Sequence, residues 1–403
     1  MTISSGDTLT YPIVDEVALD IDPVYRELQQ QGPVRIRMPY GEVCWLATRY
    51  DDVKTIHFDR RFTKAMGLVR DIPRLREGAA PKDPNMLASM DPPRHTRLRR
   101  LASGSFSPPG IRRMRAWIEG LVDEVLDAMM KAGSPVDFYS HVSWMLPNLV
   151  VTGILGIPRD DVPTFRSFID TMLATNSTME ARNQAQQSLR QYVVGLIEER
   201  RQRPTDDVLG ALVQARDQED RLTEDELVML TLNLFLGGFE TTVAQLGSTL
   251  YTLAANPQLW QELVNDRDLL PAALEELWRW IPSHRYGTPL IRWAVEDVEL
   301  SGGVVIPAGE PILPERPAAN RDESVFPQGW EVDFHREQPR PHLALGFGPH
   351  HCLGAPLAHL EIELTLERML DRFPNLELAV PPSEVAWSST SFMRCVESLP
   401  LRW

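Results

Sequence analysis

One apolar segment near the middle of the chain constrains the fold more than any other feature. It follows the sequence TEDE at residues 223–226 and runs as LVMLTLNLFLGGFETTVAQLGSTLYTLA to Asn256-Pro257. The Thr-x-x-Glu box satisfies two backbone donors at a helix start, and about 30 helical residues extend roughly 45 Å. A helix this long and apolar is expected to cross the whole molecule inside its core, which requires a large helical body around it.

The sequence before about Arg279 and the sequence after it predict different secondary structure. From His95 to about Arg279 the pattern is mostly helical, as in the amphipathic stretch IRRMRAWIEGLVDEVLDAMMKAG. After Arg279, stretches such as LIRWAVEDVEL, VVIPAGEPI and LELAV are typical of strands, and VRIRM and EVCWLAT around a Pro-Tyr-Gly turn predict a β-hairpin. With no internal repeat or long linker, we expect one domain over residues 1–403, mainly α with a smaller β-rich part (α+β).

The balance of charges excludes two classes of partner. The chain has 41 Lys and Arg against 56 Asp and Glu, a formal net charge of −15. Nucleic acid and anionic lipid attract clustered basic residues, so we expect no nucleic acid and no membrane as a partner. The N-terminus lacks the pattern of a secretory signal, and no uncharged apolar run reaches the roughly 18–20 residues of a membrane helix. A cytoplasmic location is expected.

Of the three cysteines, Cys352 has the most informative surroundings. It lies in the loop LGFGPHHCLG, residues 345–354, between Gly346 and Gly354, and a helix pattern follows at once. Glycine lets a backbone approach a flat cofactor, and backbone N–H groups at a helix start stabilise a thiolate, which is an axial haem ligand that favours O–O cleavage. Two alternatives stay open at this point: a glycine-rich turn with an inert cysteine, and a zinc site with the two preceding histidines, which adjacent residues rarely form.

This loop resembles the haem-binding loop of the cytochrome P-450 family, Phe-x-x-Gly-x-[His/Arg]-x-Cys-x-Gly. The resemblance implies the P-450 fold, with the long central helix over haem b. It also implies that Cys352 is the iron ligand, that His350 contacts a haem propionate, and that Gly346 and Gly354 lie against the cofactor. At the position of Leu345 the family usually has an aromatic residue, which shields the sulfur. The departure bears on the redox potential of the iron and not on its ligation, and Phe347 is a candidate to replace this shielding ring in part.

A second pattern, GGFETT at residues 237–242, lies in the middle of the long helix. Two glycines there cost about 1 kcal/mol each relative to alanine, so something flat is expected against the backbone. From the residues alone, a Thr241 that bonds back to its own helix stays open. The pattern resembles the P-450 motif Ala/Gly-Gly-x-Asp/Glu-Thr, which implies that Gly238 lies against haem, Thr241 hydrogen-bonds dioxygen and Glu240 relays protons. The helix is expected to open locally there.

Glu276 and Arg279 form a third pattern, Glu-x-x-Arg. At this spacing a helical ion pair is common and usually exposed. The pair resembles the Glu-x-x-Arg pair of the P-450 family, which implies a structural role next to the haem loop. Arg321 or Arg336 is expected to join Glu276 and Arg279 in one network of charged side chains.

The fourth pattern is DPPRHTRLRR at residues 91–100, where His95 and Arg99 share one helix face. A solvated basic face is the plain interpretation of these charges. The segment resembles a P-450 segment, and the resemblance implies that His95 and Arg99 hold haem propionates through charge-assisted bonds. Arg292 matches another propionate-binding arginine of the family.

The same resemblance implies a substrate pocket lined from five parts of the chain. Methionine-rich walls suit a bulky, mainly apolar ligand, although each methionine alone is equally typical of core packing. The expected lining residues are Met66, Leu68, Met172, Met179, Leu234, Gly237, Tyr286, Phe392 and Met393.

The chain has no flavin or iron–sulfur motif, so the resemblance implies electrons from a separate ferredoxin and ferredoxin reductase. A basic cluster suits an acidic ferredoxin, although an ordinary solvated helix face explains it as well. Its members are Arg97, Arg100, Arg112, Arg113 and Arg115.

The leading hypothesis is a haem-thiolate monooxygenase. It would insert one oxygen atom of O2 into a C–H or C=C bond of a polyketide, macrolide-like or other secondary metabolite. The alternatives are oxidative coupling, a peroxide-using enzyme, a non-catalytic haem sensor, and a helical protein without haem.

Overall fold

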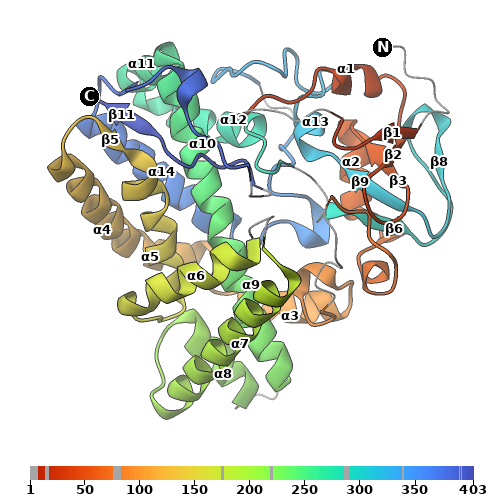
Figure 1. The fold of residues 1–403 in the computed structure, drawn as a ribbon, viewed down its shortest axis with the longest axis horizontal. Coiled ribbons are helices and arrows are strands. Elements are labelled where there is room, and N and C mark those ends of the chain that lie inside the picture. Colours follow the sequence, from red (N-terminus) through yellow and green to blue (C-terminus); the bar gives the residue numbers. More distant parts are fainter. Residues whose placement is uncertain are drawn as a thin grey trace. The chain divides into compact units, whose positions relative to one another are not determined.

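The computed structural model describes residues 8–13, 18–75, 83–173, 177–217, 221–285, 290–337, 340–389, 391 and 393–403. The chain divides into two compact units. The β-rich unit comprises Met1–Thr96 and Glu275–Cys352, and the helical unit comprises Arg97–Leu274 and Leu353–Trp403. The prediction of a mainly α chain with a smaller β-rich part is confirmed (Figure 1). The prediction of a single domain stays a prediction.

A six-stranded mixed sheet forms the centre of the β-rich unit. In order across the sheet, its strands are β1 (Thr8–Thr10), β2 (Val34–Arg37), β3 (Cys44–Ala47), β9 (Pro311–Pro314), β6 (Arg292–Ala294) and β4 (Phe62–Thr63). β2 and β3 are antiparallel, with Val34 opposite Leu46, which confirms the predicted hairpin. β6 runs antiparallel to β9 and places Arg292 opposite Ile312. A separate pair consists of β7 (Val298–Glu299) and β8 (Val305–Ile306).

Helix α2 (Tyr50–Phe58) packs its apolar stripe into the core of this unit. Tyr50, Val53 and Ile56, spaced three residues apart, are buried in one cluster with Ile312 of β9, as an amphipathic helix requires. The packing fixes where the last turn of α2, with its buried His57, stands. The short helices α1 (Val24–Leu28) and α13 (Arg316–Asn320) and the second half of α12 (Leu270–Trp280) belong to the same unit.

The long apolar segment forms two successive helices, α9 (Glu224–Gly238) and α10 (Glu240–Ala255). The predicted capping box is present: Glu226 N–H donates to Thr223 Oγ1 over 3.2 Å, and Thr223 N–H donates to Glu226 Oε2 over 3.1 Å. The helix is interrupted at Phe239, whose φ and ψ are −89° and −84°, so the expected local opening is observed. By length and composition Glu224–Ala255 could span a membrane, but 61% of its most apolar window is buried inside the protein, as expected of a core helix.

The helical unit contains further described helices in addition to α9 and α10. They are α3 (Arg94–Ser103), which starts in the β-rich unit, α4 (Pro108–Ala132), α5 (Met145–Ile154), α6 (Val162–Leu173), α7 (Met179–Gln202), α8 (Val208–Asp217), α11 (Pro257–Asn265) and α14 (Ala355–Arg372). A small sheet has the order β10 (Glu377–Leu378), β11 (Pro400–Arg402) and β5 (Val136–Asp137).

Helix α14, which begins just after Cys352, is held along α4 by ion pairs. Arg372 lies 2.5 Å from Asp123, and Arg115 lies 3.0 Å from Glu363. These contacts, together with the buried apolar face of α14, fix the direction of the helix within its unit.

Candidate functional site

The loop that carries Cys352 is closed by backbone hydrogen bonds. Cys352 N–H donates to Leu345 O over 2.8 Å, and Gly346 N–H donates to Leu343 O over 2.9 Å. Gly346 and Gly348 have φ of +77° and +66°, in the left-handed region that favours glycine. The turn therefore depends on both glycines, and Cys352 is exposed at its end.

The surroundings of the loop bear on the predicted roles of Gly354 and Phe347 and on the zinc alternative. Gly354 has an ordinary φ of −83°, and a Cβ placed on it would have no described atom within 4 Å, so open space lies there at the start of α14. The ring of Phe347 packs 6.1 Å from that of Phe58 and carries Lys54 Nζ 4.9 Å above its centre. Among the described residues, Cys352 and its neighbouring histidines do not gather into a metal-ligand group, which leaves the zinc alternative without support.

Three of the predicted propionate-binding residues lie in the β-rich unit. The rings of His95 and His350 lie 4.1 Å apart, and His95 is only 1% exposed. Arg292 is 2% exposed on β6, and its Nη1 has no hydrogen-bond partner among the described residues. Burial, followed by the charge of Arg316, lowers the pKa of Arg292 to about 10. A buried guanidinium nitrogen without an acceptor indicates a place where an anion can bind.

Two residues that the sequence analysis missed belong to the same basic group. His57 is buried with both ring nitrogens lacking a hydrogen-bond partner among the described residues. Burial, then Arg292, Arg316 and His350, holds its pKa well below the ordinary value. Arg316 is 7% exposed, and burial lowers its pKa to about 10. The signal that could have found them is their position: His57 lies on the apolar side of an amphipathic helix, and Arg316 lies two residues after the end of a buried strand.

These observations fit a flat cofactor that carries carboxylates. Haem has two propionates, and Arg292 and His57 present buried donors without acceptors. The thiol of Cys352 is exposed, and a thiolate is a ligand that haem iron accepts. The donor set of this structure therefore fits haem.

Glu276 and Arg279 form a completely buried pair, with 1% and 0% of their side chains exposed. Two bonds of 2.7 Å join them. Arg279 Nη1 also donates to the carbonyls of Asn320 and Gly329 over 2.6 and 2.7 Å, and Asn320 Oδ1 accepts from Leu343 N–H over 2.7 Å. The pair thus supports the segment that enters the cysteine loop.

Arg336 completes this network. Its Nε donates to Glu276 Oε1 over 3.1 Å. Arg321, the other expected partner, instead donates to the carbonyls of Leu19 and Trp280 over 3.0 and 3.1 Å.

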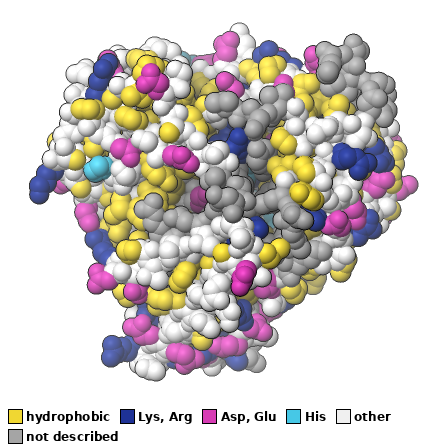
Figure 2. Space-filling model, viewed as in Figure 1, with side chains coloured by type: hydrophobic (Ala, Val, Ile, Leu, Met, Phe, Trp, Pro, Cys, Tyr) yellow, Lys and Arg dark blue, Asp and Glu magenta, His cyan; other side chains and the backbone are white. Residues whose placement is uncertain are grey.

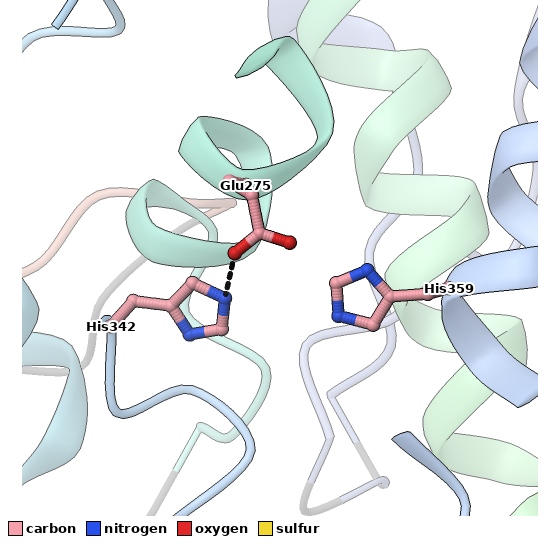
Figure 3. A group of neighbouring side chains, drawn as sticks. All are labelled: Glu275, His342 and His359. Atoms are coloured by element: carbon pink, nitrogen blue, oxygen red, sulfur yellow. Dashed lines mark ion pairs between the residues drawn. The ribbon is translucent and has the colours of Figure 1, made fainter. Parts of the chain in front are cut away.

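His342 gives a further support to the same segment. Its Nε2 lies 3.4 Å from a carboxylate oxygen of Glu275 on α12 (Figure 3), and its Nδ1 accepts from Ala344 N–H over 3.3 Å. Because Nδ1 accepts, the proton of a neutral ring resides on Nε2 and faces Glu275.

The predicted proton-delivery residues follow the break at Phe239 in the helical unit. Thr241 Oγ1 donates back to Gly237 O over 2.7 Å, as one interpretation of the sequence allowed, so the threonine oxygen keeps its lone pairs for another donor. Glu240 Oε1 accepts a hydrogen bond from Ser391 Oγ over 2.6 Å. Ser391 lies in the segment expected to line the substrate pocket.

Two other predicted cofactor residues of this unit have local contacts. A Cβ on Gly238 would stand 2.9 Å from Val151 Cγ2 of α5, so close helix packing alone accounts for a glycine there. Arg99 is half-buried on α3, and its carbonyl accepts from Ser103 Oγ over 2.7 Å.

The expected substrate-lining residues divide between the two units. Met66 and Leu68 are half-buried in the β-rich unit. In the helical unit Met172 and Leu234 are half-buried, Gly237 is exposed, Met179 is 43% exposed and Met393 is fully buried. Tyr286 and Phe392 lie outside the described residues.

The predicted basic cluster is partly neutralised. Arg97 lies 2.6 Å from Glu226, and Arg115 lies 3.1 Å from Glu119 and 3.0 Å from Glu363. Arg100, Arg112 and Arg113 remain exposed. The pairing of Arg97 and Arg115 makes the cluster weaker as a docking surface than its sequence indicates. Figure 2 shows one face of the molecule, on which basic and acidic side chains are interspersed.

A family model, curated relatives and solved structures that resemble this chain all belong to one family. The family model "Cytochrome P450" matches residues 21–392. The chain is 42% identical to nocardicin C N-oxygenase of Nocardia uniformis subsp. tsuyamanensis, over 98% of this chain and 99% of that protein. It is 40% identical to mycinamicin IV hydroxylase/epoxidase of Micromonospora griseorubida, over the full length of both. Among solved structures, cytochrome P450mel 107F1 "with biaryl coupling reactivity" superposes with a TM-score of 0.92 at 39% identity, over 98% of this chain and 100% of that one.

Proposed function

The chain belongs to the cytochrome P450 family and is a haem-dependent monooxygenase similar to bacterial enzymes of secondary metabolism, and we propose that it oxidises a bulky, mainly apolar metabolite of polyketide, macrolide-like or related origin. The reaction places one oxygen atom of O2 in a C–H or C=C bond. The relatives that act on mycinamicin IV and nocardicin C support a substrate of this size, although family membership alone does not set the substrate.

Cys352 is the axial ligand in this proposal. Its loop holds the sulfur at an exposed turn closed by the bond to Leu345 O, and helix α14 starts three residues later. Partial positive charge at a helix start favours the thiolate form. With that ligand, haem supplies the activation of dioxygen. This loop is the observation that carries the proposal.

The basic residues hold the cofactor by its carboxylates. His95, His350 and Arg292 stand in the β-rich unit, and Arg99 on α3 is the fourth member of the set. The unsatisfied donor of Arg292 supports this role most directly, because a buried guanidinium needs an acceptor.

Glu240 and Thr241 deliver protons. The break at Phe239 leaves the Gly237 carbonyl to the Thr241 hydroxyl, so the Thr241 oxygen can accept a hydrogen bond from a water while its own proton is engaged. Glu240 holds a carboxylate one residue away, which can exchange a proton with such a water. The substrate-lining residues keep the role that the resemblance to the family implies for them.

Electrons come from a ferredoxin and its reductase in this proposal, as the resemblance to the family implies. A cytoplasmic location follows from such soluble partners. Oxidative coupling is the second candidate function, favoured by the likeness to P450mel 107F1.

Isotope labelling separates the two functions. The purified protein, with a ferredoxin, its reductase and NADPH, is incubated under ¹⁸O2 with mycinamicin IV, nocardicin C and a phenolic coupling substrate as probes. A product with one ¹⁸O atom supports monooxygenation. A dimeric product without label identifies coupling instead and overturns the proposal, as does the same yield when peroxide replaces NADPH and the partners.

A further inference from the structure

Arg316 is a buried cation that matches none of the four patterns of the sequence. It is the first residue of α13, two residues after the end of strand β9, and is 7% exposed. Its Nη2 lies 3.0 Å from His284 Nδ1, and its Nη1 lies 3.6 Å from the place that a Cβ on Gly346 would take. The guanidinium therefore rests against the backbone of the cysteine loop.

The groups around Arg316 do not neutralise it. Burial and Arg316 itself hold the pKa of His284 well below the ordinary value, so His284 is a neutral neighbour. Arg292 and His57 are basic and interact with Arg316 electrostatically. The acidic groups that interact with Arg316 are Glu315 and Cys352.

Glu315 is a poor counter-ion for Arg316. Its carboxylate accepts a hydrogen bond from Tyr11 over 3.1 Å, and burial raises its pKa to about 7. Arg316 Nε and Arg292 Nη1 are both buried without a hydrogen-bond partner among the described residues. Two buried guanidiniums that interact in this way are destabilising unless an anion compensates their charge.

We propose that Arg316 is an additional cofactor-anchoring cation of this chain, which binds the haem carboxylates together with Arg292 and raises the reduction potential of the iron. The inference rests on the proposed haem-thiolate site. A positive charge held in a site of low dielectric favours the reduced, less positive iron. It thus offsets part of the electron donation from the thiolate, in a chain where Leu345 replaces the usual aromatic residue.

Arg316→Gln, with Arg316→Lys as the charge-conserving variant, tests the inference on the holoenzyme. The readouts are the midpoint potential by spectroelectrochemistry and the rate of haem transfer to apomyoglobin. We expect Arg316→Gln to have a more negative midpoint potential and roughly tenfold faster haem loss, the size of one charge-assisted hydrogen bond. Arg316→Lys should keep a potential close to that of the parent. Should Arg316→Gln not fold, Arg316→Met, which keeps the apolar stem and volume, replaces it.

Arg321→Gln is the matched control, because Arg321 is also buried on this segment but binds the carbonyls of Leu19 and Trp280. It should lower the melting temperature without moving the potential. An unchanged potential and haem-loss rate in Arg316→Gln would overturn the inference, as would equal changes in Arg316→Gln and Arg316→Lys. Failure of the haem-thiolate proposal itself is recognised separately, by the spectrum of the parent protein.

Discussion

Ser391 Oγ donates a 2.6 Å hydrogen bond to Glu240 Oε1 and accepts one of 2.9 Å from Met393 N–H. The hydroxyl proton is directed at the carboxylate, and the backbone N–H of Met393 uses one of the two lone pairs of the same oxygen. The bond ties the predicted proton-relay acid to a segment expected to line the substrate pocket. A substrate that displaces this segment would also change the position of Glu240.

Ser391→Ala should loosen Glu240 and impair proton delivery. We expect the yield of product per NADPH to fall by about tenfold or more, because one hydrogen bond to a charged group contributes about 1.5–3 kcal/mol. The solvent isotope effect on turnover should change as well. Ser391→Thr keeps the hydroxyl and should restore both quantities. Equal behaviour of the two variants would show that only packing matters at this position.

Glu240→Gln removes the titratable group but keeps the acceptor for Ser391. Turnover should fall about 100-fold, because general acid–base groups contribute effects of that order. Thr241→Ala should instead keep NADPH consumption while electrons leave as hydrogen peroxide. Both are measured from NADPH, peroxide and product in the same reaction. Intact coupling in Thr241→Ala would remove this residue from the proton path.

The long helix and its break show what local signals predict well. The capping box, the apolar run and the glycines all act within a few residues, and the structure has the helix start at Glu224 and the interruption at Phe239. The β-hairpin of β2 and β3 was predicted for the same reason, since strand alternation and turn residues are local.

The buried charges show where local signals stop. Spacing identifies Glu276 and Arg279 as a pair but does not tell that it is buried, because that depends on Arg336 and on carbonyls 41 to 52 residues away. His57 and Arg316 belong to no motif of the sequence, and their positions, on the apolar side of α2 and two residues after β9, are weak signals. The packing of α2 and β9 shows that both side chains are enclosed.

Glu276→Gln should destabilise the protein strongly. Removing one partner of a buried ion pair leaves the charges of Arg279 and Arg336 uncompensated, at a cost of about 3–5 kcal/mol. The measurements are urea unfolding and the ratio of haem to protein. Glu377→Gln, which breaks the exposed pair with Arg402, is the control and should change stability by less than about 1 kcal/mol. Similar losses in both variants would refute a special role for the buried network.

Glu315 should make stability depend on pH. Burial raises its pKa from 4.5 to about 7, and the groups that face it are Tyr11, Tyr25 and Arg316. Because the folded state holds the proton more tightly than the unfolded state, the free energy of unfolding should decrease as pH rises from about 4.5 to 7. That shift of the pKa corresponds to about 3 kcal/mol.

Glu315→Gln keeps the hydrogen bond from Tyr11 and removes the ionisation. Its free energy of unfolding should exceed that of the parent at pH 8, and the two should converge at pH 5. Unfolding curves at the two pH values measure the difference. A parent protein that gains stability between pH 5 and 7 relative to the variant would contradict the assignment.

The absorption spectrum of the dithionite-reduced protein under carbon monoxide tests the central claim, that the Cys352 thiolate binds the haem iron, most directly. The parent protein should show the strongly red-shifted Soret band of a thiolate-bound haem, and Cys352→His should bind haem with an unshifted band. Cys395→Ala, in which a buried cysteine is removed, should match the parent. A red-shifted band that persists in Cys352→His, or its absence from the fully haem-loaded parent, would contradict the account.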